Sequence, residues 1–303
     1  MKVLFNKDNP HSGELQQALG FNDADIDIAK IWPYLRTASR DVAKIIGNTN
    51  YQICEEEFDN PSGDFEKEEL LELVQYAIAL DGFRKYAPLT DLSFTNDGRL
   101  FRRDDHQVAA FEWQINKSDE ALEKSYYSAV DVLIDFIKGS DTLADSEYMQ
   151  QYTGLYVPNL DEFQKFVNLN NSHLLYFKLA PSLQLCEQRE LVNRMGQLFN
   201  EYKLPIHKHS YITNLVKNCC VYFAMADGVQ KLSVQLLPEG LMKHETNNRK
   251  AASGYDRESV TLYYKQELES LFKSLETEVK KLKNKPTEFR PINFSEDDGF
   301  VTL

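Results

Sequence analysis

Apolar residues recur at helical spacing along most of this chain, with charged residues between them. One helix, which Ser62 or Asp64 can cap and which ends near Pro88, has apolar residues around most of its circumference. We therefore expect it to be central, with Leu73, Ala77 and Leu80 in the core. The stretch 99–138 holds neither Gly nor Pro, and it predicts one long helix or two nearly coaxial helices broken near Ser118. Coiled-coil-like spacing predicts a last helix from Thr261 to Lys283.

Proline, glycine and serine indicate where the other helices begin and end. Pro33 suits the first turn of a helix that ends at Gly47, and Pro181 is expected to open a helix in the second half. Ser210 is expected to cap the helix that follows it. The segment 48–62 predicts a loop with some helix in it.

One order of elements occurs twice in the sequence. In residues 73–110 an apolar helix leads into a short alternating run, an Asn-Asp-Gly turn at 96–98 and a charged helix start. Asp-Gly favours a hairpin because it supplies the positive φ that a tight reversal needs. Residues 215–252 repeat this order, and the same spacing relates Gly98 to Gly240. We therefore expect an internal duplication.

These patterns predict a mainly α fold with two similar helical lobes, each carrying a small β-hairpin, and an extended C-terminal arm. The expected parts are an irregular N-terminal segment (1–20), a first lobe (21–139) with a hairpin at 92–101, a linker (140–158), a second lobe (159–284) with a hairpin at 232–242, and the arm (285–303).

The chain has 303 residues and a net charge of −13. This acidity argues against a nucleic-acid clamp, which needs a basic face, although DNA could pass an acidic wall without being held. No apolar run approaches the roughly 18 residues of a membrane span, and the first residues lack a signal-peptide pattern. The four cysteines show no metal spacing, and Cys219 and Cys220 are expected to be buried thiols in a reducing cytoplasm.

Catalytic motifs are missing from the sequence, which has no GxSxG, phosphate-binding glycine loop, HExxH or CxxC. Asp23, Asp25 and Asp27 alternate, but the positions that need Gly and Glu in a calcium loop hold other residues. His207 and His209 could share a metal on a strand, but a surface loop fits them better because no third ligand is near. We expect no enzymatic activity, no cofactor and no metal.

Interaction residues are expected at the first hairpin and in the arm. Two prolines forbid a continued helix after Lys285, and spaced phenylalanines suit an arm that docks on another subunit. The two arginines after the hairpin could meet phosphate or a partner's carboxylate, or be a solvated helix start. Trp32 and Trp113 are expected in the core. The interface candidates are Asn96, Asp97, Gly98, Arg102, Arg103, Phe289, Phe294 and Phe300.

Several motifs together resemble a known group of proteins. They are Tyr-Leu-x-x-Ala at 34–38, Ile-Ile-Gly at 45–47, Leu-Val-Gln-x-Ala-x-Ala at 73–79, a Trp-bearing charged helix at 102–117, and Tyr-x-x-Ala with a later Leu-Ile-x-Phe at 126–136. Residues 159–282 fit the same group. The order is similar to that of phage and prophage proteins of Bacteroides and its relatives that look like head–tail connector (adaptor) proteins.

The resemblance implies structural work in a virion. Connectors form homo-oligomeric rings, commonly dodecameric, between the portal and the tail proteins. DNA would pass through the ring without being specifically bound, no membrane or cofactor would be involved, and assembly would take place in the cytoplasm of the host bacterium.

Two other functions remain open at this point. The first is a cytoplasmic helical adaptor or scaffold that binds a partner through the C-terminal helix and arm. The second is an enzyme of unrecognised type. Finding the protein in purified particles would separate the connector from both.

Overall fold

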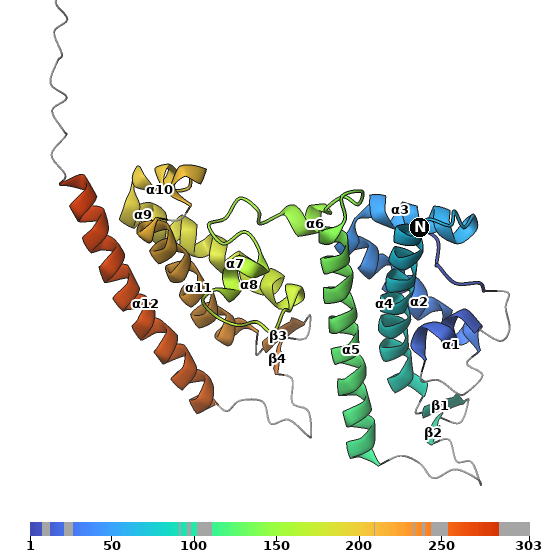
Figure 1. Ribbon diagram of the computed structural model, residues 1–303. Helices are drawn as coiled ribbons and strands as arrows, with labels where there is room; N and C mark the ends of the chain where they lie inside the picture. Colours follow the sequence, from blue (N-terminus) through green and yellow to red (C-terminus); the bar gives the residue numbers. More distant parts are fainter. Residues whose placement is uncertain are drawn as a thin grey trace, which may run out of the picture.

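The computed structural model describes residues 1–7, 13–20, 27–90, 92–95, 98–101, 111–208, 210–232, 234–237, 240–243 and 254–284. This part of the chain is mainly helical, as predicted. Two groups of helices lie side by side (Figure 1), and we name them the first and second lobes. None of the helices in the ranges given above is long and apolar enough to cross a membrane.

The first lobe contains five helices and one strand pair among its described residues. They are α1 (Gly13–Leu19), α2 (Ile28–Ile46), α3 (Asn48–Asp59), α4 (Phe65–Thr90), β1 (Leu92–Thr95), β2 (Gly98–Phe101) and α5 (Glu112–Gly139).

A short helix, α6 (Glu147–Gln150), leads to the second lobe. The elements of this lobe are α7 (Leu160–Gln164), α8 (His173–Cys186), the π-helical turn η1 (Glu187–Leu191), α9 (Val192–Met195), α10 (Leu198–Glu201), the 3-10 turn η2 (Pro205–His207), α11 (Tyr211–Lys231), β3 (Val234–Leu237), β4 (Gly240–Lys243) and α12 (Gly254–Lys283).

Helix α4 is the centre of the first lobe, as expected from its broad apolar surface. It packs against α1, α2, α3 and α5. The carboxylate of Asp64 accepts a hydrogen bond from the backbone N–H of Glu66 at 3.1 Å, which confirms the expected cap. The helix runs two residues past Pro88, which was expected to end it. Helix α5 continues through Ser118 without a break. Of the two expectations for this stretch, the single helix is therefore the correct one for the described residues.

Prolines stand inside two helices that they were expected to open. Helix α2 starts before Pro33 because Asp27 caps it, its carboxylate accepting from the N–H of Ala29 at 3.0 Å, and because Ile31 is fully buried. Helix α8 starts before Pro181 because Ser172 caps it through the N–H of Leu175. A proline inside a helix removes one hydrogen bond, and burial of the preceding turn compensates for that loss.

Three segments expected to be irregular are folded. The N-terminal segment 1–20 includes α1, and Leu4 and Leu15 are fully buried. The predicted loop at 48–62 is mostly α3. The predicted linker at 140–158 contains α6 and buries Val157. The apolar residues of these segments have no clear periodicity, so the sequence pattern did not predict helices there. They are buried by neighbours that are distant in sequence, and this burial stabilises the segments.

The core of the second lobe lies between α8, α11 and α12. Ser210 caps α11 through the N–H of Thr213 at 3.1 Å, as predicted. Cys219 and Cys220 are buried free thiols, also as predicted. Helix α12 begins at Gly254, earlier than expected, and packs its apolar side within the same chain. Its buried apolar residues are Leu268, Phe272, Leu275 and Val279.

Two further predictions about the core were wrong. Ala77 and Leu80 are buried, but Leu73 is only partly buried because the neighbouring Val74 takes the inward position. Trp113 is 54% exposed, since it lies in the first turn of α5, where the helix extends beyond its neighbours. Trp32 packs partly buried against the core.

Each lobe carries one two-stranded antiparallel sheet among its described residues. β1 pairs with β2, with Leu92 opposite Phe101, and β3 pairs with β4, with Val234 opposite Lys243. In Figure 1 both pairs lie toward the end of the molecule where α5 and α12 begin.

Candidate interaction site

Most of the interface candidates lie outside the described residues. Gly98 is the first residue of β2 and pairs with Thr95. The candidates outside the described residues are Asn96, Asp97, Arg102, Arg103, Phe289, Phe294 and Phe300. The structure instead brings together other residues, in three places.

The first place is the junction of the lobes, where α5 meets α8. Asp131 accepts hydrogen bonds from the backbone N–H groups of His173, at 2.7 Å, and Leu174, at 3.4 Å. Asp135 lies 2.7 Å from Nε2 of His173. Burial raises the pKa of Asp131, although these backbone hydrogen bonds act in the opposite direction. Asp131 thus serves the start of α8 as a cap from another helix, and this holds the lobes together.

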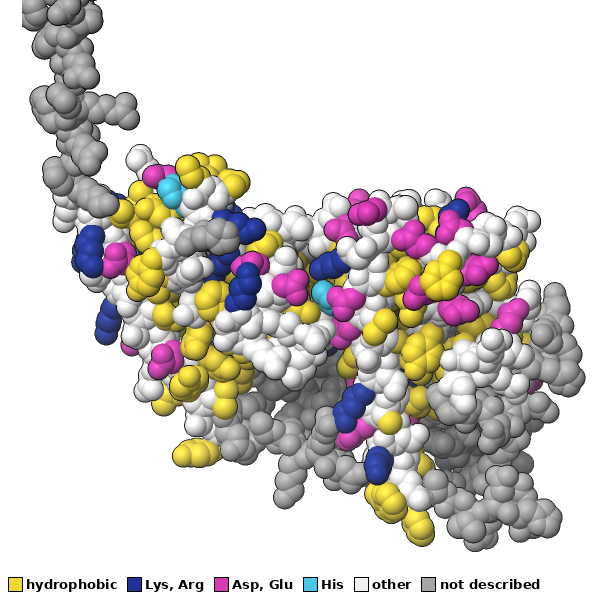
Figure 2. All heavy atoms as spheres, in the orientation of Figure 1, with side chains coloured by type: hydrophobic (Ala, Val, Ile, Leu, Met, Phe, Trp, Pro, Cys, Tyr) yellow, Lys and Arg dark blue, Asp and Glu magenta, His cyan; other side chains and the backbone are white. Residues whose placement is uncertain are grey.

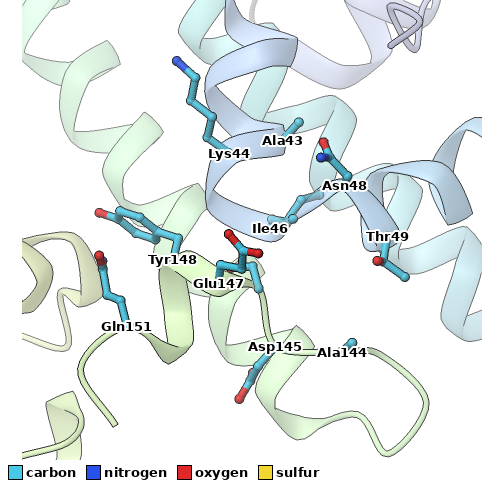
Figure 3. Close-up of a pocket in the computed structure, with 12 residues that line it drawn as sticks. Ala43, Lys44, Ile46, Asn48, Thr49, Ala144, Asp145, Glu147, Tyr148 and Gln151 are labelled. Carbon is cyan, nitrogen blue, oxygen red and sulfur yellow. The ribbon is translucent and has the colours of Figure 1, made fainter. Parts of the chain in front are cut away.

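The second place is a groove at the corner between α2 and α3, facing α6. Its cavity has a volume of about 770 Å³. Figure 3 shows that Lys44 points away from Asp145 and Glu147, so the acidic side chains on the α6 side are not paired with it. We call this the acidic groove. Its lining residues are Ala43, Lys44, Ile46, Gly47, Asn48, Thr49, Ala144, Asp145, Ser146, Glu147, Tyr148 and Gln151.

Short polar contacts hold the walls of the acidic groove in place. The side-chain amide of Asn50 donates to the carbonyls of Ile46, at 2.8 Å, and Ala144, at 2.7 Å. Gly47 has a φ of 86°, and a Cβ on it would lie 2.9 Å from the Cβ of Ser146. Only glycine suits both the backbone conformation and the close approach, so this wall is fixed.

The third place is a cavity of about 350 Å³ in the second lobe, which we call the lysine pocket. Three lysines and one glutamate line it, in a chain whose net charge is −13. Figure 2 shows Lys and Arg side chains gathered on this lobe. The lining residues are Leu155, Tyr156, Pro158, Asn159, Glu162, Tyr202, Lys203, Leu204, Pro205, Lys208, Thr213 and Lys217.

Ion pairs fix two of the pocket lysines. Lys217 is nearly buried and its Nζ lies 2.8 Å from Oε2 of Glu162, whose other oxygen pairs with Lys165 at 2.5 Å. Desolvation raises the pKa of Glu162, but the hydrogen bonds from both lysines outweigh it and hold this pKa below its usual value. Lys203 pairs with Glu187 at 2.7 Å. Lys208 is exposed and has no ion pair with the described residues.

Tyr156 and Tyr202 contribute aromatic rings to the lining of the lysine pocket, and Phe199 and His207 lie next to these residues. The Nζ of Lys203 lies 5.2 Å from the ring centroids of both Tyr156 and Phe199. Burial, with a smaller contribution from Glu187, raises the pKa of Tyr156, so this phenol stays neutral. Tyr202 stacks on His207 with the ring centroids 4.5 Å apart. The pocket can therefore hold a carboxylate beside an aromatic or aliphatic side chain.

Sequence reasoning missed the lysine pocket. It placed His207 and His209 in a surface loop. His207 ends the 3-10 turn η2, and His209 lies outside the described residues. The sequence pattern did not connect this segment with Glu162 and Lys217. The one available signal was local: two lysines and a proline occur within 203–208 of an acidic chain.

Two groups of exposed apolar side chains lie at the beginnings of α5 and α12, at one end of the molecule. Phe111 and Trp113, at the start of α5, are 64% and 54% exposed. Tyr255, Leu262 and Tyr263, near the start of α12, are between 53% and 80% exposed. Figure 2 shows hydrophobic side chains at the lower ends of both lobes. Contiguous apolar patches on a protein surface are typical of interaction sites.

A metal site is not formed by the part of the chain that the structure describes, since no three His, Cys, Asp or Glu side chains there could share an ion. The lysine pocket offers charged and aromatic groups, and the beginnings of α5 and α12 offer apolar ones.

Comparison with known proteins places the chain in a family. No curated protein and no solved structure matches it. Residues 42–154 and 175–290 match the family described as a family of unknown function, DUF6712. Because these two segments cover more than half of the sequence, the chain belongs to this family.

Proposed function

We propose that this chain is a non-enzymatic virion structural protein, a subunit of a head–tail connector ring between portal and tail. The exposed apolar side chains at the beginnings of α5 and α12 carry the proposal. Each aromatic side chain left in water forgoes roughly 1.5–3 kcal/mol of burial. In a ring each subunit has a neighbour on either side. Ring assembly would therefore cover the exposed side chains at the start of α5 and those at the start of α12 at the same time.

The charge of the chain suits a channel wall. With 47 acidic and 34 basic residues, neighbouring subunits present an acidic surface to DNA, which repels phosphate and lets the duplex slide. Apolar contacts between subunits must then offset the repulsion between acidic copies.

We also propose that the two lobes arose by duplication. A shared Asp-Gly-x-x-Lys motif supports this. On α4, Lys85 pairs with Asp81 at 2.5 Å, and on α11, Lys231 pairs with Asp227 at 2.5 Å. In both halves the motif is followed by a strand pair and then a long helix. The order of elements is thus the same around an equivalent ion pair.

The glycine of each motif occupies a similar packing position. A Cβ on Gly82 would lie 2.7 Å from Cδ2 of Leu35 on α2, and a Cβ on Gly228 would lie 2.3 Å from Cδ2 of Leu179 on α8. In each half, glycine lets the central helix approach an earlier helix of the same lobe: α4 approaches α2, and α11 approaches α8.

Identification of the protein in virions tests the proposed function. Particles would be purified from an induced host, and their proteins would be identified by mass spectrometry and by immunogold labelling. We expect label at the neck between head and tail. A protein present in the lysate but absent from intact particles would refute the connector.

A helical adaptor that binds one partner through α12 is the second candidate. The exposed Tyr255, Leu262 and Tyr263 favour it, because they form a partner surface on α12 alone. Matched substitutions separate the two functions. Tyr263→Ser should abolish association in both cases, whereas Phe111→Ser at the start of α5 should matter only if both groups of exposed side chains are covered in a ring.

A further inference from the structure

We propose that the lysine pocket of one copy receives the acidic C-terminal arm, residues 285–303, of a second copy. This inference rests on the proposed function only in assuming that copies of the chain associate. It assigns a donor segment and an acceptor site to that association.

Charge complementarity is the first argument. The arm contains the cluster Glu296-Asp297-Asp298, and the pocket presents three lysines with one glutamate. Lys203 and Lys217 are already paired with Glu187 and Glu162. Lys208 is exposed and has no ion pair with any described residue, so it is the group that an incoming carboxylate would meet.

The apolar lining is the second argument. The arm carries phenylalanines at 289, 294 and 300, on either side of the acidic cluster. The pocket walls include Tyr156, Tyr202 and Pro205 beside the lysines. A volume of about 350 Å³ suits one or two side chains, and the rest of the arm would lie along the surface. The apolar and acidic groups of the arm thus have complementary rings and lysines in the site.

The point where the arm begins is the third argument. Helix α12 ends at Lys283, whose side chain lies beside Gly196, between α9 and α10. The pocket loop 202–208 directly follows α10. Figure 1 shows the end of α12 at the same end of the second lobe as α9 and α10. Fully extended, the 19 residues of the arm span about 60–70 Å. This length suffices for the pocket of its own chain and for that of an adjoining copy, and labelled chains distinguish the two.

The net charge of the chain and the symmetry of an arm-to-pocket contact favour a second copy as the occupant of the pocket. A chain with a net charge of −13 repels its own kind, and an acidic arm in a lysine pocket offsets that repulsion at one contact. Each copy contributes one arm and one pocket, which is a head-to-tail contact, and such contacts form a ring when the rotation between neighbouring copies closes.

A charge swap in the full-length chain tests the proposal. The first variant is Lys208→Glu, and the second carries Glu296→Lys, Asp297→Lys and Asp298→Lys. Isotope-labelled and unlabelled chains are mixed and treated with a carbodiimide, which joins carboxylates to neighbouring lysines. Mass spectrometry then distinguishes links between chains from links within one chain.

In the wild type we expect links between chains that join 296–298 to the lysine pocket. Each variant alone should lose them about tenfold, because like charges then face each other. The equimolar mixture of the two variants should regain them. The matched control Lys124→Glu, an exposed lysine on α5, should leave them unchanged. Circular dichroism confirms that each variant is folded.

Three results would overturn the inference. They are a wild type without links between chains, mixed variants that do not regain the links, and an arm that links only to its own chain. The outcome for the proposed function is separate. If the mixed variants regain the links but the protein is absent from virions, the connector function is refuted and the contact between arm and pocket stands. If the protein is present in virions but the links are absent, the contact is refuted and the connector function stands.

Discussion

The substitution Gly82→Ala tests the packing of the first lobe. Gly82 is buried on α4 where this helix crosses α2. An added Cβ would lie 2.7 Å from Cδ2 of Leu35, 3.3 Å from its backbone nitrogen and 3.4 Å from its Cα. The first contact involves the end of a side chain, but the other two involve backbone, so the two helices must separate by a few tenths of an ångström.

Two opposing effects set the magnitude. Replacing glycine by alanine inside a helix stabilises it by up to about 1 kcal/mol. Overpacking a buried contact costs typically about 1–3 kcal/mol, and contact with backbone places Gly82 at the upper end of that range. The net expectation is a loss of about 1–2 kcal/mol in the free energy of unfolding, roughly a tenfold increase in the unfolded fraction.

Two other glycines provide matched controls. A Cβ on Gly228 meets only side-chain atoms, mainly of Leu179, which can change its rotamer, so Gly228→Ala should cost less. Gly139 ends α5 with nothing within 4 Å of an added Cβ, so Gly139→Ala should not destabilise the protein. Urea unfolding followed by circular dichroism gives the free energies, and amide hydrogen exchange shows whether α2 and α4 are the helices affected. If Gly82→Ala is as stable as Gly139→Ala, the close approach of α2 and α4 is wrong.

Three further predictions concern two buried side chains and the C-terminal arm. Leu70→Ala should lower the free energy of unfolding by about 2–5 kcal/mol because Leu70 is fully buried, whereas Leu73→Ala on the same helix should lower it clearly less. Equal losses in urea unfolding would contradict the assigned burial. Burial raises the pKa of Cys54 to about 12, so its thiol should resist iodoacetamide at pH 8 until the protein unfolds, and rapid native alkylation would contradict this. A chain ending at Lys285 should keep nearly all helix content by circular dichroism but fail to join particles, and normal incorporation would show that the arm is not needed.

The sequence alone determined features that depend on local spacing. Apolar periodicity identified the central α4. The sequence offered Ser62 or Asp64 as the cap of α4 and Ser210 as the cap of α11, because a cap bonds to a backbone group two or three residues away. Burial of Cys219 followed from its place on an apolar helix. Each of these depends on interactions within one or two helical turns, which a linear pattern contains.

The tertiary structure alone decided features that depend on distant partners. Pro33 lies inside α2 because the burial of Ile31 outweighs one lost hydrogen bond. Leu73 turned out half-buried because the neighbours of α4 determine which of its apolar sides faces inward. The lysine pocket joins Glu162 to Lys217, which are 55 residues apart. Pairing over such a separation is set by how helices pack against one another, and the order of residues along the chain does not contain it.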